Sequence, residues 1–168
     1  MKLFILTAIC LAVVTCGNTH DAAQTKFAAP DNWKSINSCG VTFHAPPDMK
    51  EEQVRPIDSC VVRYRNNDTV LELDSIMYRA PGTSRKAEYS DKRDFSLRKL
   101  TIYGRNAEII FCYETELAAN YNGLNYAAVL YVPDLPRGRG NLTIWTYSRS
   151  SDTRALATKI LESVRFDK

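Results

Sequence analysis

Two pairs of acidic residues could perform chemistry because they alternate along stretches that we predict as strands. The first pair is Glu72 and Asp74, and the second is Glu114 and Glu116. Residues two positions apart on a strand share one face and lie about 7 Å apart. That spacing suits hydrolysis by two carboxylates or the binding of a hard cation. The same alternation is typical of the wet side of a half-buried strand, which is the interpretation that we prefer.

Other catalytic and cofactor-binding patterns are missing from the sequence. Of the histidines, His20 lies near the N-terminus and His44 directly precedes an Ala-Pro-Pro turn. No Gly-x-Ser-x-Gly motif is present, and the cysteines are too dispersed for a zinc site. The formal net charge is only +3, whereas nucleic-acid binding usually requires a larger, clustered excess. We therefore expect a non-enzymatic protein with no metal, no cofactor and no nucleic-acid partner.

The N-terminus predicts export from the cytoplasm. Met1-Lys2 is followed by an apolar to weakly polar run over 3–15. That run is too short to span a bilayer and is typical of a signal peptide, which we place at 1–15. Residues 13–16, Val-Val-Thr-Cys, resemble the lipobox of bacterial lipoproteins, in which the cysteine becomes the lipidated N-terminus. We predict Cys16 as the lipidation site, with an ordinary secretory signal cleaved nearby as the alternative.

The residues after Cys16 predict where the mature protein is held. Gly17 follows the cysteine where an aspartate could stand. By resemblance to sorting in Gram-negative bacteria, this favours anchoring to the outer membrane on its periplasmic side. Residues 16–30 contain Ala, Thr, Gln and Asn and predict a short flexible tether. The expected partners are the membrane, through the lipid, and an envelope protein or a small ligand.

Export makes disulfide bonds possible. Of the five cysteines, Cys10 leaves with the signal peptide and Cys16 is the lipid site. Cys39 and Cys60 share strand parity with apolar neighbours and would face inward from adjacent strands. A bridge between them closes a loop of about 20 residues, which is typically worth about 3 kcal/mol. Cys112 then remains as a half-buried free thiol.

The firmest structural prediction is a β-hairpin over 107–132. Two runs of alternating apolar residues flank Asn122-Gly123, a dipeptide that tolerates the positive φ angles of a type I′ turn. A two-residue turn there pairs Tyr113 with Val132. The apolar faces of the two strands then coincide, and a slip of one residue would turn one face to solvent.

The remaining residues of 31–168 predict one α+β domain. The charged stretch 79–94 is expected to be a solvated loop that could hold a short helix near 84–89, with a docking surface for an acidic partner or anionic lipid as the alternative. Residues 49–56 are also expected to form a loop. Further strands are predicted at 33–36, 40–44, 59–65, 70–78, 95–103 and 142–147.

A C-terminal helix is predicted after Ser151-Asp152, which offers an N-cap and negative charge at the positive end of the helix dipole. Such a helix must lie across a sheet face to bury its apolar stripe. The predicted fold is an antiparallel meander packed by this helix. The stripe consists of Ala157, Ile160, Leu161 and Val164, extended in the first turn by Ala155 and Leu156.

Three short segments of this domain share one resemblance. They are Gly40-Val41-Thr42-Phe43 running into Pro46, Ile-Tyr-Gly-Arg-Asn-Ala at 102–107, and the C-terminal 157–166. Each resembles a structural segment of small PsbP-like domains, although Tyr103 stands where that family usually has aspartate. The resemblance implies an α/β sandwich around an antiparallel sheet. It also implies a binding or accessory module and brings no catalytic residues.

The strand face opposite the C-terminal helix would gather aromatic and acidic side chains. In the predicted register, Tyr131 shares this face with Glu114 and Glu116, and the last strand could add two more aromatic residues. The face is either a second core layer, which we favour, or a binding surface. With two arginines from the loop over 133–140, the candidate binding residues are Glu114, Glu116, Tyr131, Trp145, Tyr147, Arg137 and Arg139.

Three functions follow in decreasing order of preference. The first is a non-enzymatic, lipid-anchored binding or accessory module of the bacterial periplasm. The second is a periplasmic immunity or inhibitor protein that neutralises an exported toxin or a cell-wall hydrolase, with its loops plugging the active site. The third is a hydrolase that uses one of the two acidic pairs.

Overall fold

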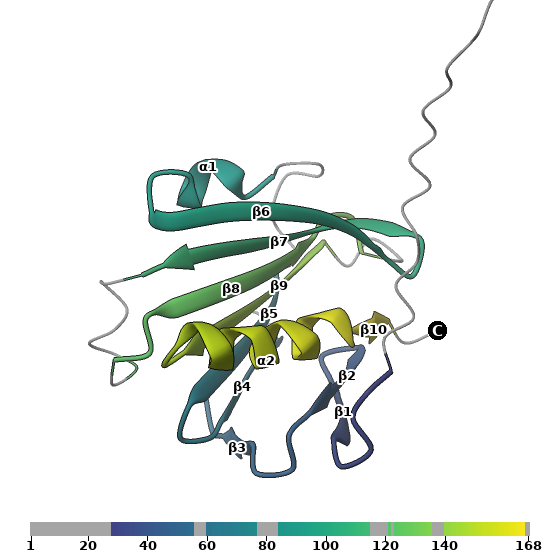
Figure 1. Ribbon diagram of the computed structural model, residues 1–168. Helices are drawn as coiled ribbons and strands as arrows, with labels where there is room; N and C mark the ends of the chain where they lie inside the picture. The colour runs from purple at the N-terminus through teal and green to yellow at the C-terminus, as the bar shows by residue number, and fades with distance from the viewer. Residues whose placement is uncertain are drawn as a thin grey trace, which may run out of the picture.

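The computed structural model describes residues 28–55, 60–76, 84–114, 121, 123–135 and 140–166. They form a seven-stranded sheet, a three-stranded sheet and two helices (Figure 1). The predicted signal peptide, Cys16 and most of the predicted tether lie outside the described residues. The elements are β1 (Lys34–Ser38), β2 (Val41–Ala45), β3 (Lys50–Glu52), β4 (Cys60–Arg65), β5 (Thr69–Ile76), α1 (Lys86–Tyr89), β6 (Arg93–Ile102), β7 (Arg105–Tyr113), β8 (Tyr126–Val132), β9 (Asn141–Ser148), α2 (Ser151–Glu162) and β10 (Arg165–Phe166).

The large sheet has the order β3-β4-β5-β9-β8-β7-β6. Every neighbouring pair is antiparallel, so two meanders, β3 to β5 and β6 to β9, join through the β5–β9 pair. α2 crosses one face of this sheet, and the small sheet β1-β2-β10 lies beside the C-terminal end of the helix (Figure 1). The predicted α+β meander with a C-terminal helix is therefore confirmed.

The predicted hairpin has the correct faces and the wrong register. β7 and β8 do pair, but Tyr113 lies opposite Tyr126 and not opposite Val132. The displacement is an even number of residues, so the same side chains face the core in either register. A turn does form before Leu124, whose N–H donates to Tyr121 O at 3.3 Å, and Gly123 has a φ of +79°. The strands stop short of this turn.

Two-residue hairpin turns occur instead at the ends of two other strand pairs. Tyr103 and Gly104 join β6 to β7 with φ angles of +50° and +75°. Cys39 and Gly40 join β1 to β2 in the same way, with φ angles of +53° and +75°. Positive φ at both central residues is the signature of the type I′ turn, in which Asn, Asp and Gly are usual. Tyr103 is an uncommon residue for such a position.

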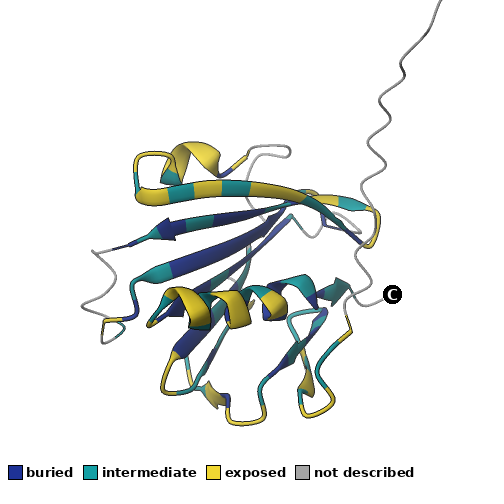
Figure 2. Ribbon diagram, viewed as in Figure 1, coloured by how far each residue is buried: buried dark blue, intermediate teal, exposed yellow. Residues whose placement is uncertain are grey.

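The main core lies between α2 and the sheet. Ala157, Ile160 and Leu161 are buried on α2, and Val164 follows them into the core, so the predicted stripe is confirmed. Ala155 and Leu156 were predicted to extend the stripe, but both are exposed. One side of α2 is exposed along its length (Figure 2). Both residues lie on the side of the helix that faces solvent, because the sheet contacts a stripe narrower than the sequence suggested.

The cap of α2 begins one residue earlier than predicted. Ser150 is the N-cap: its Oγ accepts from the Thr153 N–H at 3.2 Å, and its own N–H donates to Thr153 Oγ1 at 2.9 Å. These reciprocal bonds form a capping box, which satisfies backbone donors that the helix itself leaves unpaired. Ser151 is therefore the first helical residue and not the cap.

Other details differ from the predictions or confirm them. β3 lies within the stretch predicted as a loop, and β10 adds a short strand after α2. Cys39 and Cys60 form the predicted disulfide, with a Cα–Cα distance of 5.6 Å. Cys112 is a free thiol, but it is fully buried where we expected it to be half-buried.

Candidate functional site

The predicted aromatic residues meet on the sheet face opposite α2. Trp145 lies opposite Val129 and Tyr147 lies opposite Ala127 in the β8–β9 register. Tyr131 and Tyr147 are buried, with exposed fractions of 1% and 6%. The structure therefore brings the three aromatic residues together under a cover.

Glu114 is the predicted acidic residue that the structure describes on this side of the molecule. It directly follows β7 and is buried, and Lys92 Nζ lies 3.0 Å from its Oε1. Glu116, Arg137 and Arg139 lie outside the described residues.

The cover over Trp145 and Tyr131 consists of residues 84–92, which we call the strap, while the Tyr121 ring stacks on Tyr147 with its centroid 4.7 Å away. The strap contains the single-turn helix α1 and leads into β6 (Figure 1). Most of its residues are exposed, and α1 itself buries none (Figure 2). Arg85 is the buried residue of the strap, with 5% of its side chain exposed.

Side chains attach the strap to the sheet. Ser84 Oγ donates to Glu108 Oε2 at 2.7 Å, and Trp145 Nε1 donates to the Tyr89 hydroxyl at 3.0 Å. Tyr89 also packs against the apolar cluster beneath it, which includes Cys112. The strap therefore covers the aromatic face through polar bonds and ring contacts.

The Arg85 guanidinium lies over two aromatic rings. Its Cζ is 5.1 Å from the ring centroid of Trp145 and 5.6 Å from that of Tyr131. Glu88 Oε2 lies 3.3 Å from Arg85 Nη1, but 40% of the Glu88 side chain is exposed. Cation–π contacts gain strength when water is excluded, so the two rings carry much of the compensation for this buried charge.

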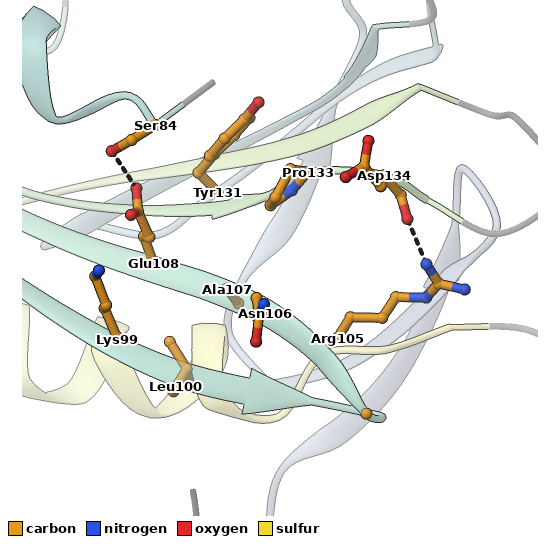
Figure 3. Close-up of a pocket in the computed structure, with 11 residues that line it drawn as sticks. Ser84, Lys99, Leu100, Arg105, Asn106, Ala107, Glu108, Tyr131, Pro133 and Asp134 are labelled. Atoms are coloured by element: carbon orange, nitrogen blue, oxygen red, sulfur yellow. Dashed lines mark hydrogen bonds between the residues drawn. The ribbon is translucent and has the colours of Figure 1, made fainter. Parts of the chain in front are cut away.

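A pocket of about 570 Å³ opens beside the strap, where β7 and β8 diverge. Their pairing ends at Glu108 and Tyr131, while β7 continues for three residues paired only with β6. We call this cavity the fork pocket (Figure 3). Its lining residues are Ser84, Lys99, Leu100, Gly104, Arg105, Asn106, Ala107, Glu108, Tyr131, Pro133 and Asp134.

Charges of both signs line the fork pocket. Lys99 and Glu108 are cross-strand neighbours, so they stand side by side on one wall. On the opposite side, the Arg105 guanidinium donates to the backbone carbonyl of Asp134 (Figure 3). A pocket with two cationic and two anionic side chains suits a polar ligand or the polar segment of a protein.

The Glu72 and Asp74 pair is not arranged as a catalytic dyad. Glu72 Oε2 accepts two bonds from Arg63, at 2.6 and 3.0 Å, and a third from the Tyr121 hydroxyl at 3.1 Å. Both Arg63 donors converge on one oxygen of Glu72, so this carboxylate serves as the acceptor of a structural ion pair. Glu72 and Asp74 are both half-buried on β5.

Burial shifts the titration of several groups on the strap side. It raises the pKa of the Cys112 thiol to about 11, and the neighbouring Glu114 charge acts in the same direction. Burial also raises the pKa values of Tyr89 and Tyr147. Cys112 is therefore a protonated, unreactive thiol at neutral pH, since the thiolate is the nucleophilic form.

Within the part of the chain that the structure describes, no three His, Cys, Asp or Glu side chains are grouped so that they could hold a metal ion. No helix formed by these residues is long and apolar enough to cross a membrane.

Sequence reasoning missed Arg85 and the fork pocket. Arg85 lies in a run of charged residues that we expected to be solvated, and its residue type gives no sign of burial. The pocket depends on where the β7–β8 ladder ends, which the alternating pattern does not specify. The signal nearest to the pocket was the 102–107 segment, which forms the turn and strand at one of its walls.

Comparison with known proteins identifies the fold. No family model matches the sequence, and no curated protein matches it. A solved structure that matches is the solution structure of cyanobacterial PsbP (CyanoP) from Synechocystis sp. PCC 6803, with a TM-score of 0.53 and 12% identity. The match covers 92% of this chain and 98% of that chain. The described domain therefore has a PsbP-like fold, as the sequence segments suggested.

Proposed function

We propose that this protein is a non-enzymatic binding or accessory module of the bacterial cell envelope, exported and anchored through a lipid on Cys16. The PsbP-like fold supports a module of this kind. The Cys39–Cys60 disulfide supports an oxidising compartment, because such bonds form and persist outside the cytoplasm.

The fork pocket is the proposed contact point, and its mixed charge is the observation that carries the proposal. Lys99, Arg105, Glu108 and Asp134 surround one cavity at the end of the sheet. A polar segment of another envelope protein could pair with both signs of charge there. Complementary charge of this kind chiefly determines specificity and the rate of association.

Mass spectrometry of the native protein tests the anchor. The proposal predicts that the mature chain begins at Cys16 and carries a diacylglyceryl group. An intact Met1, or a mature chain without an acyl group, would contradict it.

Capture from envelope extract by the immobilised full chain tests the contact point. The amount of stoichiometric partner recovered by the double variant Lys99→Glu, Arg105→Glu should be at least tenfold lower than the amount recovered by the wild type. Lys50→Glu is the matched control, because Lys50 is exposed on β3 at the opposite edge of the sheet. Equal recovery by all three proteins would contradict a role for the fork pocket.

A further inference from the structure

The chemistry of the partner can be inferred from the residue that the strap inserts into the sheet. Arg85 is the one strap residue that is buried, although its neighbours Lys86, Ala87 and Glu88 are exposed. A long charged side chain on an exposed loop normally keeps its head group in water. Burying this guanidinium instead requires a site that is built to receive it.

Three aromatic side chains form that site, which we call the cage. Trp145 and Tyr131 present their rings to the Arg85 guanidinium at 5.1 and 5.6 Å. Tyr89 accepts a 3.0 Å hydrogen bond from Trp145 Nε1, which holds its ring beside that of Trp145. Two of the three walls stand on the central strands β8 and β9, so they are held in place without the strap.

The cage suits a guanidinium better than an ammonium ion. A planar guanidinium stacks on aromatic faces and is more weakly hydrated than a lysine ammonium, so it is the easier cation to desolvate. Among the described residues, Arg85 Nε has no hydrogen-bond partner, and the nearby Glu88 carboxylate is partly in water. The rings therefore provide the recognition, with little help from buried acceptors.

The strap is attached in a way that allows its replacement. Two backbone hydrogen bonds, Glu88 N–H to Arg85 O and Lys92 N–H to Tyr89 O, lie within the strap. Side-chain bonds from Ser84 to Glu108 and from Lys92 to Glu114 join it to the sheet. Displacing this cover would break these side-chain bonds and the packing of Tyr89 on its apolar cluster, but no strand ladder of the sheet.

We propose that the Trp145 and Tyr131 rings, the two walls of the cage that stand on the sheet, are a receptor for an arginine side chain, which Arg85 fills within the free protein and an arginine of the protein partner fills in the complex. The inference rests on the proposed binding function, because it names the chemistry of that partner. Tyr131 and Ser84 also line the fork pocket. Displacement of the strap would therefore reshape the pocket as the partner binds.

Binding of short peptides to full-length wild type and Arg85→Ala tests the receptor. The probe is acetyl-Gly-Arg-Gly-amide, and its lysine counterpart is the control. The signal is the fluorescence of Trp145, with Trp33→Phe in every protein to remove the second tryptophan. The arginine peptide should bind Arg85→Ala at least tenfold more tightly than the lysine peptide. Trp145→Leu added to this variant should abolish binding, which is measured by titration calorimetry because this variant has no tryptophan signal.

Wild type should bind the same arginine peptide about 10- to 100-fold more weakly than Arg85→Ala, because the internal arginine competes. Alkylation of Cys112, which belongs to the apolar cluster that Tyr89 packs against, should rise as wild type becomes saturated. If Arg85→Ala does not fold, Arg85→Gln provides the open cage. Equal affinity for both peptides, or no binding to wild type at 100 times the concentration that saturates the open variant, would overturn the proposal.

This test is separate from the envelope capture. Failure of the arginine peptide together with capture that depends on Lys99 and Arg105 would reject the receptor and retain the binding function. Binding of the arginine peptide without capture of a partner would retain the receptor and reject the fork pocket as the contact point for an envelope protein.

Discussion

The two faces of the large sheet are covered by elements of different construction. On one face, α2 buries Ala157, Ile160 and Leu161 and is closed at its N-terminus by the Ser150 capping box. On the other, the strap buries one arginine, and its helix of four residues has no side-chain cap at its N-cap residue. The helix α2 is therefore part of the core, whereas the strap is held by a small number of contacts.

This difference suggests that the α2 face mainly stabilises the fold and that the strap face mainly serves binding. Apolar burial is non-directional and is lost only when the elements come apart, so α2 should open only with the whole domain. The strap depends on a few ring contacts and hydrogen bonds, which exchange readily for equivalent contacts from another chain. The functional surface is therefore expected on the strap side, where a partner can offer the same chemistry.

The largest expected effect comes from shortening a buried side chain of α2. Leu161→Ala should lower the free energy of unfolding by about 3 kcal/mol, since it leaves a cavity in the packed core. Denaturant titration followed by circular dichroism measures this change. Leu156→Ala is the matched control, because Leu156 is 38% exposed on the same helix, and a similar loss for both variants would contradict the assigned core.

Alkaline pH should lower the free energy of unfolding through Cys112, which is buried on the strap side. The native chain holds the Cys112 proton to about pH 11, whereas the unfolded thiol releases it near its ordinary pKa of 9.0. This contribution to stability is complete below about pH 9 and is lost as the pH rises to about 11. The advantage of wild type over Cys112→Ala in free energy of unfolding should therefore shrink by about 2 kcal/mol between pH 8.5 and 11. A constant advantage across this range would refute the assigned burial.

The smallest expected effects on stability come from replacing two serines, Ser150 at the start of α2 and Ser84 in the strap. Ser150→Ala removes the capping box of α2 and should cost about 1 kcal/mol of global stability. Ser84→Ala removes the bond to Glu108 and should leave the global value within about 0.5 kcal/mol, since the strap opens independently of the core. Chemical denaturation of both variants checks the difference. Equal global losses would show that the strap and the core unfold together.

The sequence predicted the elements whose apolar residues repeat at the helix or strand period. It missed the features that tertiary contacts determine, such as the register of paired strands. The α2 stripe and the paired apolar faces of β7 and β8 repeat at helix and strand periods, so they could be read directly. The β7–β8 register could not, because Tyr113 keeps the same face opposite Tyr126 or Val132. The short strands β3 and β10 have too few residues to show a period.

The candidate site was predictable only in part. The clustering of Tyr131, Trp145 and Tyr147 followed from strand parity. The Cys39–Cys60 bridge was predicted correctly, but Cys39 lies in the β1–β2 turn and not on a strand adjacent to β4. The burial of Arg85 could not be predicted, because it depends on contact with rings contributed by β8 and β9, more than 40 residues later in the chain. Local sequence carries no signal for such a contact.

Native-state thiol labelling tests the contrast between the two covers most directly. Iodoacetamide labelling of Cys112 in the full chain, followed by peptide mass spectrometry, reports opening of the strap side. In a Val164→Cys variant, the added thiol reports opening of the α2 side, since Val164 is fully buried in that core. Cys112 should be labelled at least tenfold faster and with little dependence on low denaturant, as expected for local opening. Equal rates with equal denaturant dependence would show that both faces open only by global unfolding, and would contradict the account.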